Sequence, residues 1–225
     1  NNSQLTFDRS DALTVSNNIS GSGNLTQAGS GTTTLTGSNT YTGTTTVSAG
    51  TLQVGDGGTT GNLGSDNVIN NSQLTFDRSD ALTVSNDISG NGDLTQAGTG
   101  TTNLTGSNTY AGTTTISAGN LQVGDGGTTG NLGSGNVINN ANLTVNRSDA
   151  NTVNNDISGS GNLTQAGTGT TTLTGSNTYT GTTTISAGTL QVGDGGTTGN
   201  LGNGNVSNNS QLTFDRSDAL TVSNN

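Results

Sequence analysis

The feature that most constrains the fold of this chain is a repeat of 69 residues. Residues 1–69, 70–138 and 139–207 form three units, and residues 208–225 repeat residues 1–18 without a change. A repeat of this length predicts a solenoid, in which each unit packs only against its neighbours along the rod. Residues 1–225 are therefore expected to be a single solenoid segment, cut from a longer array of the same units.

Within each unit, apolar residues alternate with polar ones over short runs. Leu35 stands between Thr34 and Thr36, and Leu52 and Val54 flank Gln53. Side chains of a β-strand point alternately to opposite faces, so these runs predict strands with one apolar face. Gly, Asn, Asp and Ser separate the runs, as expected of tight turns. No run shows the 3.6-residue period of a helix.

We expect about three coils per repeat. In the first unit the coils are predicted over residues 3–23, 24–43 and 44–70. In a parallel solenoid each strand bonds to the equivalent strand of the next coil, about 4.8 Å away, so the backbone is satisfied even where side chains are small. The sequence therefore predicts an all-β, parallel β-solenoid.

A thin core is expected to hold the coils together. Only 25% of the residues are hydrophobic and 38 are Gly, a composition that without the repeat is typical of disorder. The L-T-F alternation predicts that Phe7, Phe76 and Phe214 point inward within the apolar column, with Leu5, Leu74 and Leu212 on the same face.

One exchange between units does not fit an apolar column. Asn151 stands where the first two units have Leu13 and Leu82. Two interpretations are open: this position is partly exposed, or the third unit is weakened there.

The net charge of −10 excludes some partners. All 14 acidic residues are Asp, against four Arg. We expect such a chain to repel nucleic acid and anionic membrane surfaces. No apolar run approaches the roughly 20 residues that span a bilayer, so we expect no membrane insertion by this segment.

The run from Gly31 to Gly64 carries a family resemblance. Its core, G-x-N-T-Y-x-G-x-T-T-[VI]-x-x-G-x-L-x-V-G, occurs at residues 37–55, 106–124 and 175–193. It resembles the autotransporter-associated β-strand repeat of passenger domains of secreted bacterial surface proteins. The resemblance implies a right-handed parallel β-helix, an extracellular or cell-surface location, and often an adhesive or stalk role. It supplies no catalytic residues.

The motif Asp-Arg-Ser-Asp is the first candidate for chemistry. It stands at residues 8–11, 77–80 and 215–218, with Asn146 replacing the first Asp in the third unit. Carboxylates beside an Arg occur in enzymes that cleave acidic polysaccharides. The alternative is a surface turn with an Arg–Asp pair of little energetic value. We favour the turn and predict no enzyme activity, because the chain lacks His, Cys, Lys and Glu, which removes most general bases and nucleophile pairs.

A Gly-Asp-Gly-Gly turn at residues 55–58 raises the question of calcium. Calcium-binding β-roll repeats carry an Asp in nearly every turn, whereas here Asp56, Asp125 and Asp194 occur once per repeat. Asn62 and backbone carbonyls would have to complete the ligand set. We therefore predict a structural turn and no cofactor, with these three Asp as weak calcium candidates.

Outward threonines suggest a further function. Rows of Thr on a flat solenoid face bind ice in some proteins, and Thr32, Thr34, Thr36, Thr44 and Thr46 could form such rows. The plainer interpretation is that Thr favours strands and solubilises their outer face.

The sequence favours a structural role outside a bacterial cell, as a spacer, stalk or fibre segment. The alternative is an adhesive surface that binds host or matrix glycans. Neither end of the chain reads as a polar cap, so we expect end-to-end association with another copy.

Overall fold

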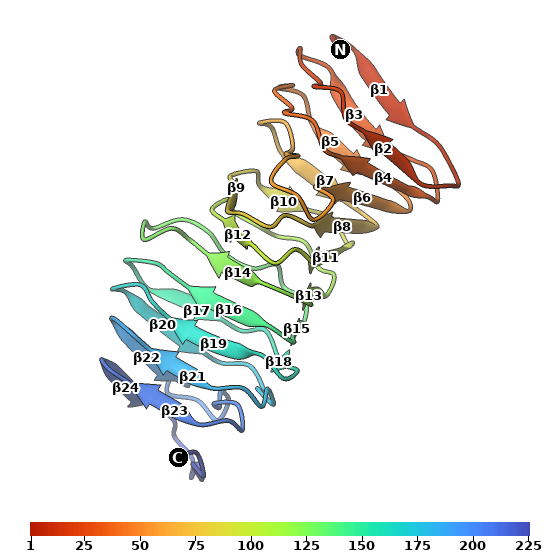
Figure 1. Cartoon of the computed structure of the whole chain (residues 1–225). Helices are drawn as coiled ribbons and strands as arrows, with labels where there is room; N and C mark the ends of the chain where they lie inside the picture. Colours follow the sequence, from red (N-terminus) through yellow and green to blue (C-terminus); the bar gives the residue numbers. More distant parts are fainter.

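The chain forms an elongated rod of β-strands, turns and loops, described over all 225 residues by a computed structural model (Figure 1). The rod has about 11 turns and no helix, and every strand pair is parallel. At about 4.8 Å per coil it is roughly 50 Å long. The predicted parallel β-solenoid is confirmed.

Twenty-four short strands form four parallel sheets. The first contains β1 (Gln4–Phe7), β3 (Asn24–Gln27), β5 (Thr45–Val47), β7 (Val68–Asn70) and β10 (Ile88–Ser89). The second contains β2 (Leu13–Val15), β4 (Thr32–Leu35), β6 (Thr51–Val54), β8 (Gln73–Phe76), β11 (Asp93–Gln96), β13 (Thr114–Ile116), β15 (Val137–Asn139) and β18 (Ile157–Ser158). The third contains β9 (Leu82–Val84), β12 (Thr101–Leu104), β14 (Asn120–Val123), β16 (Asn142–Val145), β19 (Asn162–Gln165), β21 (Thr183–Ile185) and β23 (Val206–Asn208). The fourth contains β17 (Asn151–Val153), β20 (Thr170–Leu173), β22 (Thr189–Val192) and β24 (Gln211–Phe214).

The four sheets occupy three faces. Face one holds the first sheet and then the fourth, with residues 108–110 and 131–133 between them. The amide of Ile88 in β10 donates to Asn108 Oδ1, and the amide of Asn108 donates to Asn131 Oδ1. Face two is the eight-stranded sheet, and face three is the seven-stranded sheet, preceded by residues 39–41 and 62–64. The chain visits the three faces in strict rotation.

The repeat does not fill a whole number of coils. From β8 to β15 it holds eight strands, and the irregular segments 108–110 and 131–133 also each occupy a face. Ten segments on a three-sided coil make three and one-third coils, so each repeat begins one face further round. The Gln-Leu-Thr-Phe strand accordingly lies in a different sheet each time, as β1, β8 and β24, with the related β16 between them. The predicted coil over residues 44–70 contained one strand too many, because β7 already belongs to the next coil.

The core is a column of stacked inward side chains. Leu52, Leu74 and Leu94 lie on one another through β6, β8 and β11 and are fully buried. The next step of this column is Thr114, whose buried hydroxyl lies 2.7 Å from the hydroxyl of Tyr110. This pairing satisfies two polar groups inside the core. In all, 33 buried apolar residues form one continuous cluster.

The inward prediction for Phe holds fully at one of three positions. Phe76 and Leu74 have no exposed surface, whereas Phe7 is only partly buried and Phe214 is 44% exposed. Phe214 lies in β24, and no later strand of the chain covers it on that face. Phe76 lies on face two, whereas Phe7 and Phe214 lie at opposite ends of face one, so the rings stack on other residue types, as Phe76 does on Val54 and Gln96.

Glycine at the corners allows the coils to stack closely. A Cβ atom on Gly98 would collide with the backbone of Arg78 one coil below, and one on Gly29 would collide with Arg9. Replacement of such a glycine would push neighbouring coils apart, so the high Gly content is a requirement of the stacking.

Candidate functional site

Each long corner loop is clamped by an arginine of the following coil. The loop of residues 55–61 turns through Gly55, Gly57 and Gly61, which all have positive φ. Arg78 follows β8 and donates from Nη2 to the carbonyl of Thr59 at 2.6 Å and from Nη1 to that of Gly61 at 2.7 Å. The loop is therefore tied to the coil above it rather than left free.

The same guanidinium also holds the Asp-Arg-Ser-Asp turn. Arg78 Nε and Nη2 each donate to the carboxylate of Asp80 at 2.8 Å. Arg147 and Arg216 repeat the arrangement, and each is 13% exposed. Arg9 makes the Asp pair without a preceding loop and is 53% exposed. The predicted Arg–Asp pair is present, but three of the four arginines are structural clamps, a role that the sequence reasoning missed.

This geometry bears on the carboxylate hypothesis. With its donors committed to two carbonyls and a carboxylate, Arg78 has little capacity left to stabilise charge on a bound substrate. The hydrogen bond from Arg147 lowers the pKa of Asp149 below its ordinary value. A carboxylate held ionised in this way is a poor general acid.

The three weak calcium candidates lie in separate loops. Asp56 Oδ1 accepts the amide hydrogen of Gly58 at 3.3 Å, and Asp125 Oδ1 accepts that of Gly127 at 3.2 Å. These are local turn bonds. No three acidic side chains gather in a group that could hold a metal ion. Asn62 is engaged in hydrogen bonds to the neighbouring coil, so no ligand cluster supports the three weak calcium candidates, and the absence of a cofactor stays a prediction.

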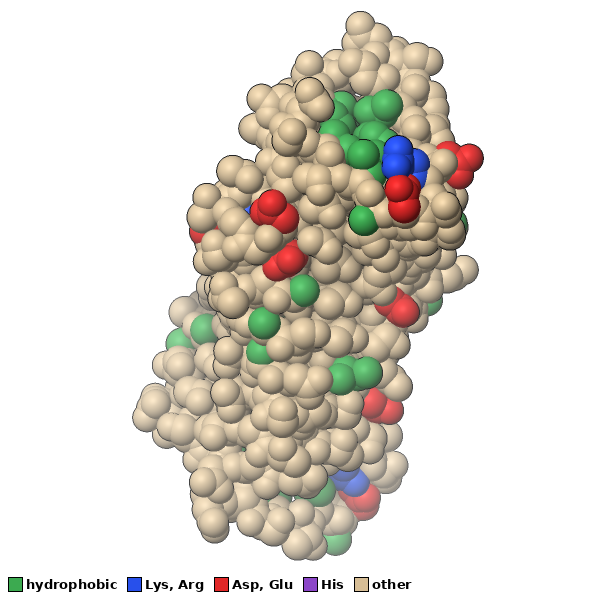
Figure 2. All heavy atoms as spheres, turned by 45° about the vertical axis from the view of Figure 1, so that its right-hand side comes forward, with side chains coloured by type: hydrophobic (Ala, Val, Ile, Leu, Met, Phe, Trp, Pro, Cys, Tyr) green, Lys and Arg blue, Asp and Glu red, His purple; other side chains and the backbone are tan.

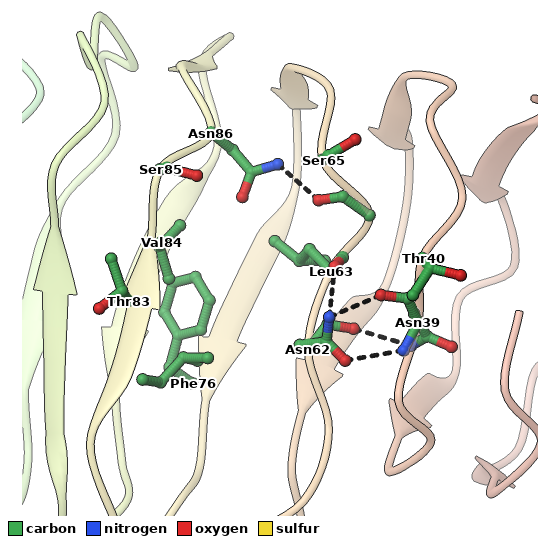
Figure 3. Close-up of a pocket in the computed structure, with 12 residues that line it drawn as sticks. Asn39, Thr40, Asn62, Leu63, Ser65, Phe76, Thr83, Val84, Ser85 and Asn86 are labelled. Atoms are coloured by element: carbon green, nitrogen blue, oxygen red, sulfur yellow. Dashed lines mark hydrogen bonds between the residues drawn. The ribbon is translucent and has the colours of Figure 1, made fainter. Parts of the chain in front are cut away.

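A seam lies where residues 39–41 and 62–64 replace strands on face three. Asn39 donates its backbone amide to Asn62 Oδ1 at 2.7 Å and its side-chain amide to the carbonyl of Asn62 at 2.7 Å. Asn62 Nδ2 returns a bond to the carbonyl of Asn39 at 2.7 Å (Figure 3). Side-chain amides thus replace the missing strand ladder. A constant spacing of 23 residues between these Asn, repeated at 108 and 131, was the available sequence signal.

A pocket of about 320 Å³ opens beside this seam. Figure 3 shows Phe76, Val84 and Asn86 on one side of it, and Leu63 with the amides of Asn39 and Asn62 on the other. None of its 12 lining residues is titratable, and Asn86 Nδ2 is bound to the carbonyl of Gly64 at 2.8 Å. The pocket therefore offers neither an acid–base group nor a free amide from Asn86.

The exchange at residue 151 falls on the second copy of this pocket. Its volume is about 260 Å³, and Asn151 lines it where Leu82 lines the first. Asn151 is half-buried, whereas Leu82 is 8% exposed. The position is partly open in the third unit, in agreement with the first of the two interpretations.

The outward threonines form short, interrupted rows. On face two, Thr75, Thr95 and Thr115 stack in register, but Ile138 follows on one side and Gln53 precedes on the other. Thr34 is likewise stacked between Thr14 and Gln53. The flat, regular Thr lattice that the ice-binding hypothesis requires is not formed.

The surface as a whole is polar and mostly uncharged. Figure 2 shows scattered acidic side chains along the rod and a small group of apolar side chains beside a basic one near its upper end. The large hydrophobic residues that are most exposed are Ile69, Ile138, Phe214 and Val222. The structure contains no helix that is long and apolar enough to cross a membrane.

Comparison with known proteins identifies the repeat. The passenger-associated-transport-repeat family matches residues 25–54, 94–123 and 163–192, once in each unit. Each match runs from β3 to β6 or the equivalent strands, and so includes the seam segment between β4 and β5.

A curated relative agrees with this assignment. The chain is 49% identical over 123 residues to the adhesin BmaC autotransporter of Brucella suis biovar 1 (strain 1330). The alignment covers 55% of this chain and 4% of the adhesin, so the chain spans a small part of that protein. No solved structure matches the chain. The resemblance and the bacterial-surface location expected from it are confirmed: each of the three units of the chain carries one passenger-associated-transport repeat.

Proposed function

We propose that this segment is a stiff spacer or stalk in the extracellular passenger of a bacterial surface protein. The observation that carries the proposal is the continuity of the rod. Parallel strand ladders or hydrogen bonds of Asn side chains connect each coil to the next on all three faces. One core cluster runs from Ile19 to Leu201. A rod of this kind holds whatever lies at its ends at a fixed distance.

As part of this proposal, the segment has no enzyme activity. Three of the four arginines are engaged as clamps, and the sequence contains no His, Cys, Lys or Glu. The repeat family is a structural unit of passengers, which supports the same conclusion.

Small-angle X-ray scattering of the 225-residue chain tests the spacer. We expect a rod with a maximum dimension of about 50 Å or more and a constant cross-section. A profile typical of an expanded, flexible chain would contradict the proposal. Electron microscopy of the native protein on cells then distinguishes its settings, since long continuous filaments indicate a fibre and short projections indicate a stalk.

End-to-end association is the proposed self-contact. β1 and β24 each present an unpaired strand edge, and Leu5, Phe7 and Val15 of the first two strands are only partly buried. The net charge of −10 opposes contact along the whole side of two rods more than contact at their ends. We expect association to grow with salt, which screens the Asp residues. A species that stays monomeric in analytical ultracentrifugation at all protein and salt concentrations would contradict this.

A second candidate function is an adhesive surface. The named relative is an adhesin, and three polar pockets of this chain favour a role in ligand binding.

A further inference from the structure

The rod carries the same polar pocket three times. The first copy lies at the corner that follows face two and is lined by Asn18, Ser38, Thr59, Thr60, Asn62 and Arg78, with four neighbours. The second and third copies are lined by the residues 69 and 138 positions later. Their volumes are about 340, 320 and 510 Å³, at the lower end of the range of ligand pockets, which is about 300–1,000 Å³.

The lining is rich in neutral hydrogen-bonding groups. None of the ten lining residues in any copy is hydrophobic. In the second copy the hydroxyls of Ser107, Thr128 and Thr129 are on exposed residues and have no bond to the protein. Hydroxyl groups both donate and accept, so they suit a ligand that does the same.

The charges at the pocket exclude an anion. Its one cation, Arg147 in the second copy, donates to the carbonyls of Thr128 and Gly130 and to the carboxylate of Asp149. The guanidinium is thus neutralised and its donors are occupied, while the chain as a whole carries −10. A sulfated or carboxylated ligand finds no free partner here.

One position differs between the copies in a way that matters for binding. Asn18 in the first pocket becomes Asp87 in the second and Asp156 in the third. In each copy Oδ1 accepts the backbone amide of a Ser on the next coil, 20 residues later, at 2.7, 2.6 and 2.7 Å for Ser38, Ser107 and Ser176. The remaining group is an NH₂ donor at Asn18 but a carboxylate oxygen at Asp87, which is a stronger acceptor for ligand hydroxyls.

We propose that these three corner pockets are saccharide subsites, each of which takes one neutral sugar unit through its hydroxyls. The second and third bind more tightly than the first because of the carboxylate. The inference deepens the second candidate function and leaves the spacer role untouched, since the backbone bonds that build the rod do not involve a ligand. Polar sites of this kind are weak one by one, and repetition along an array raises the overall avidity.

The placement of the copies sets the geometry of binding. The pockets follow face two, face three and face one in turn, because each repeat advances by one face. Successive copies are about 16 Å apart along the rod and point to different corners. The three pockets would therefore be filled by glycan chains that surround the rod, and glycans on a flat surface at one side of the rod could not reach all three.

The test uses amide NMR of the ¹⁵N-labelled 225-residue chain with methyl glycosides of mannose, galactose and glucose, each at up to tens of millimolar. Sialic acid, glucuronic acid and inorganic phosphate serve as anionic probes. The residues around Asn18 and Asp87 differ, so the first and second pockets give separate signals. Three variants accompany the wild type. Thr129→Trp fills the second pocket. Asp87→Asn gives the second pocket the side-chain amide found in the first, and Asn18→Asp gives the first pocket the carboxylate found in the second.

We expect at least one neutral glycoside to shift the amides of Ser107 and Thr129. Thr129→Trp abolishes this shift, whereas Thr99→Trp, at an exposed Thr outside the pockets, leaves it unchanged. Asp87→Asn weakens binding at the second pocket about tenfold, and Asn18→Asp tightens the first by a similar factor. Each variant's circular-dichroism melting curve verifies that the rod is intact.

Three results would overturn the proposal: no glycoside shifts the lining residues, only the anionic probes bind, or the shifts survive Thr129→Trp. None of these affects the scattering profile, so a failure of the saccharide sites is distinct from a failure of the spacer.

Discussion

Replacement of Phe76 by Asp tests the assignment of the inner face most directly. The Phe76 ring is fully buried between Val54 and Gln96 of the adjacent coils. The nearest basic residue in sequence, Arg78, is bound to Asp80 and to two carbonyls, so it cannot compensate a new carboxylate. The change would place an unpaired charge inside the core.

The magnitude follows from two contributions. Truncation of a buried Phe costs about 3–5 kcal/mol, because transfer free energy is lost and a cavity remains. A buried group without a hydrogen-bond partner adds about 1–3 kcal/mol, and more when it is charged. We therefore expect Phe76→Asp to lower the free energy of unfolding by at least about 5 kcal/mol, and Phe76→Ala by about 3–5 kcal/mol.

The chain supplies its own control. Phe214 has the same local sequence but is 44% exposed at the end of the rod, so we expect Phe214→Asp to cost less than about 1 kcal/mol. Urea unfolding monitored by far-ultraviolet circular dichroism measures all three variants. Equal effects of Phe76→Asp and Phe214→Asp, or unchanged unfolding of Phe76→Asp, would refute the burial of this face.

Three further predictions concern the tyrosines, the clamps and catalysis. Burial raises the pKa of Tyr110 above its ordinary 10.0, so the neutral phenol stabilises the fold fully below pH 10, and this stability is lost as the pH rises through the pKa of the folded state. Tyr110→Phe should therefore flatten the dependence of the urea midpoint on pH above 10. At neutral pH the same variant should cost about 1 kcal/mol, because the hydrogen bond to Thr114 is lost. Arg78→Ala should destabilise the rod by about 1–3 kcal/mol and speed hydrogen exchange in the loop of residues 55–61. Arg9 holds no loop, so Arg9→Ala should change the stability by less than about 0.5 kcal/mol. No unsaturated or reducing ends should be released from pectin-like polysaccharides, and release that Asp77→Asn abolishes would contradict the non-catalytic assignment.

The sequence predicted which side chains face inward because that information is local. The period of two fixes the inner positions of each strand, and Leu52, Leu74 and Leu94 lie where the alternation places them. The burial of Phe76 follows from the same rule. The exposure of Phe214 does not, because it depends on whether another coil covers that strand, a property of the stack and not of the strand.

The clamps and pockets depend on contacts between coils. Arg78 bonds to Thr59 and Gly61, which precede it by 19 and 17 residues, and this distance has meaning only when the register of the coils is known. The loop of residues 55–61 and the seam at residues 39–41 contribute no strands, so alternation could not place them. The corner pockets combine residues from four consecutive coils and were for this reason not visible in the sequence.

The fractional repeat also has a mechanical consequence. Each unit contains one seam, where side-chain amides of residues such as Asn39 and Asn62 replace a strand ladder over two coils. If the repeat held three whole coils, all seams would lie on one face, and the rod would bend more easily there. Because the repeat holds three and one-third coils, the seams fall on face three at residues 39–64, on face one at residues 108–133 and on face two at residues 177–202. Strands cover the other two faces at every seam, so no face of the rod is continuously weak.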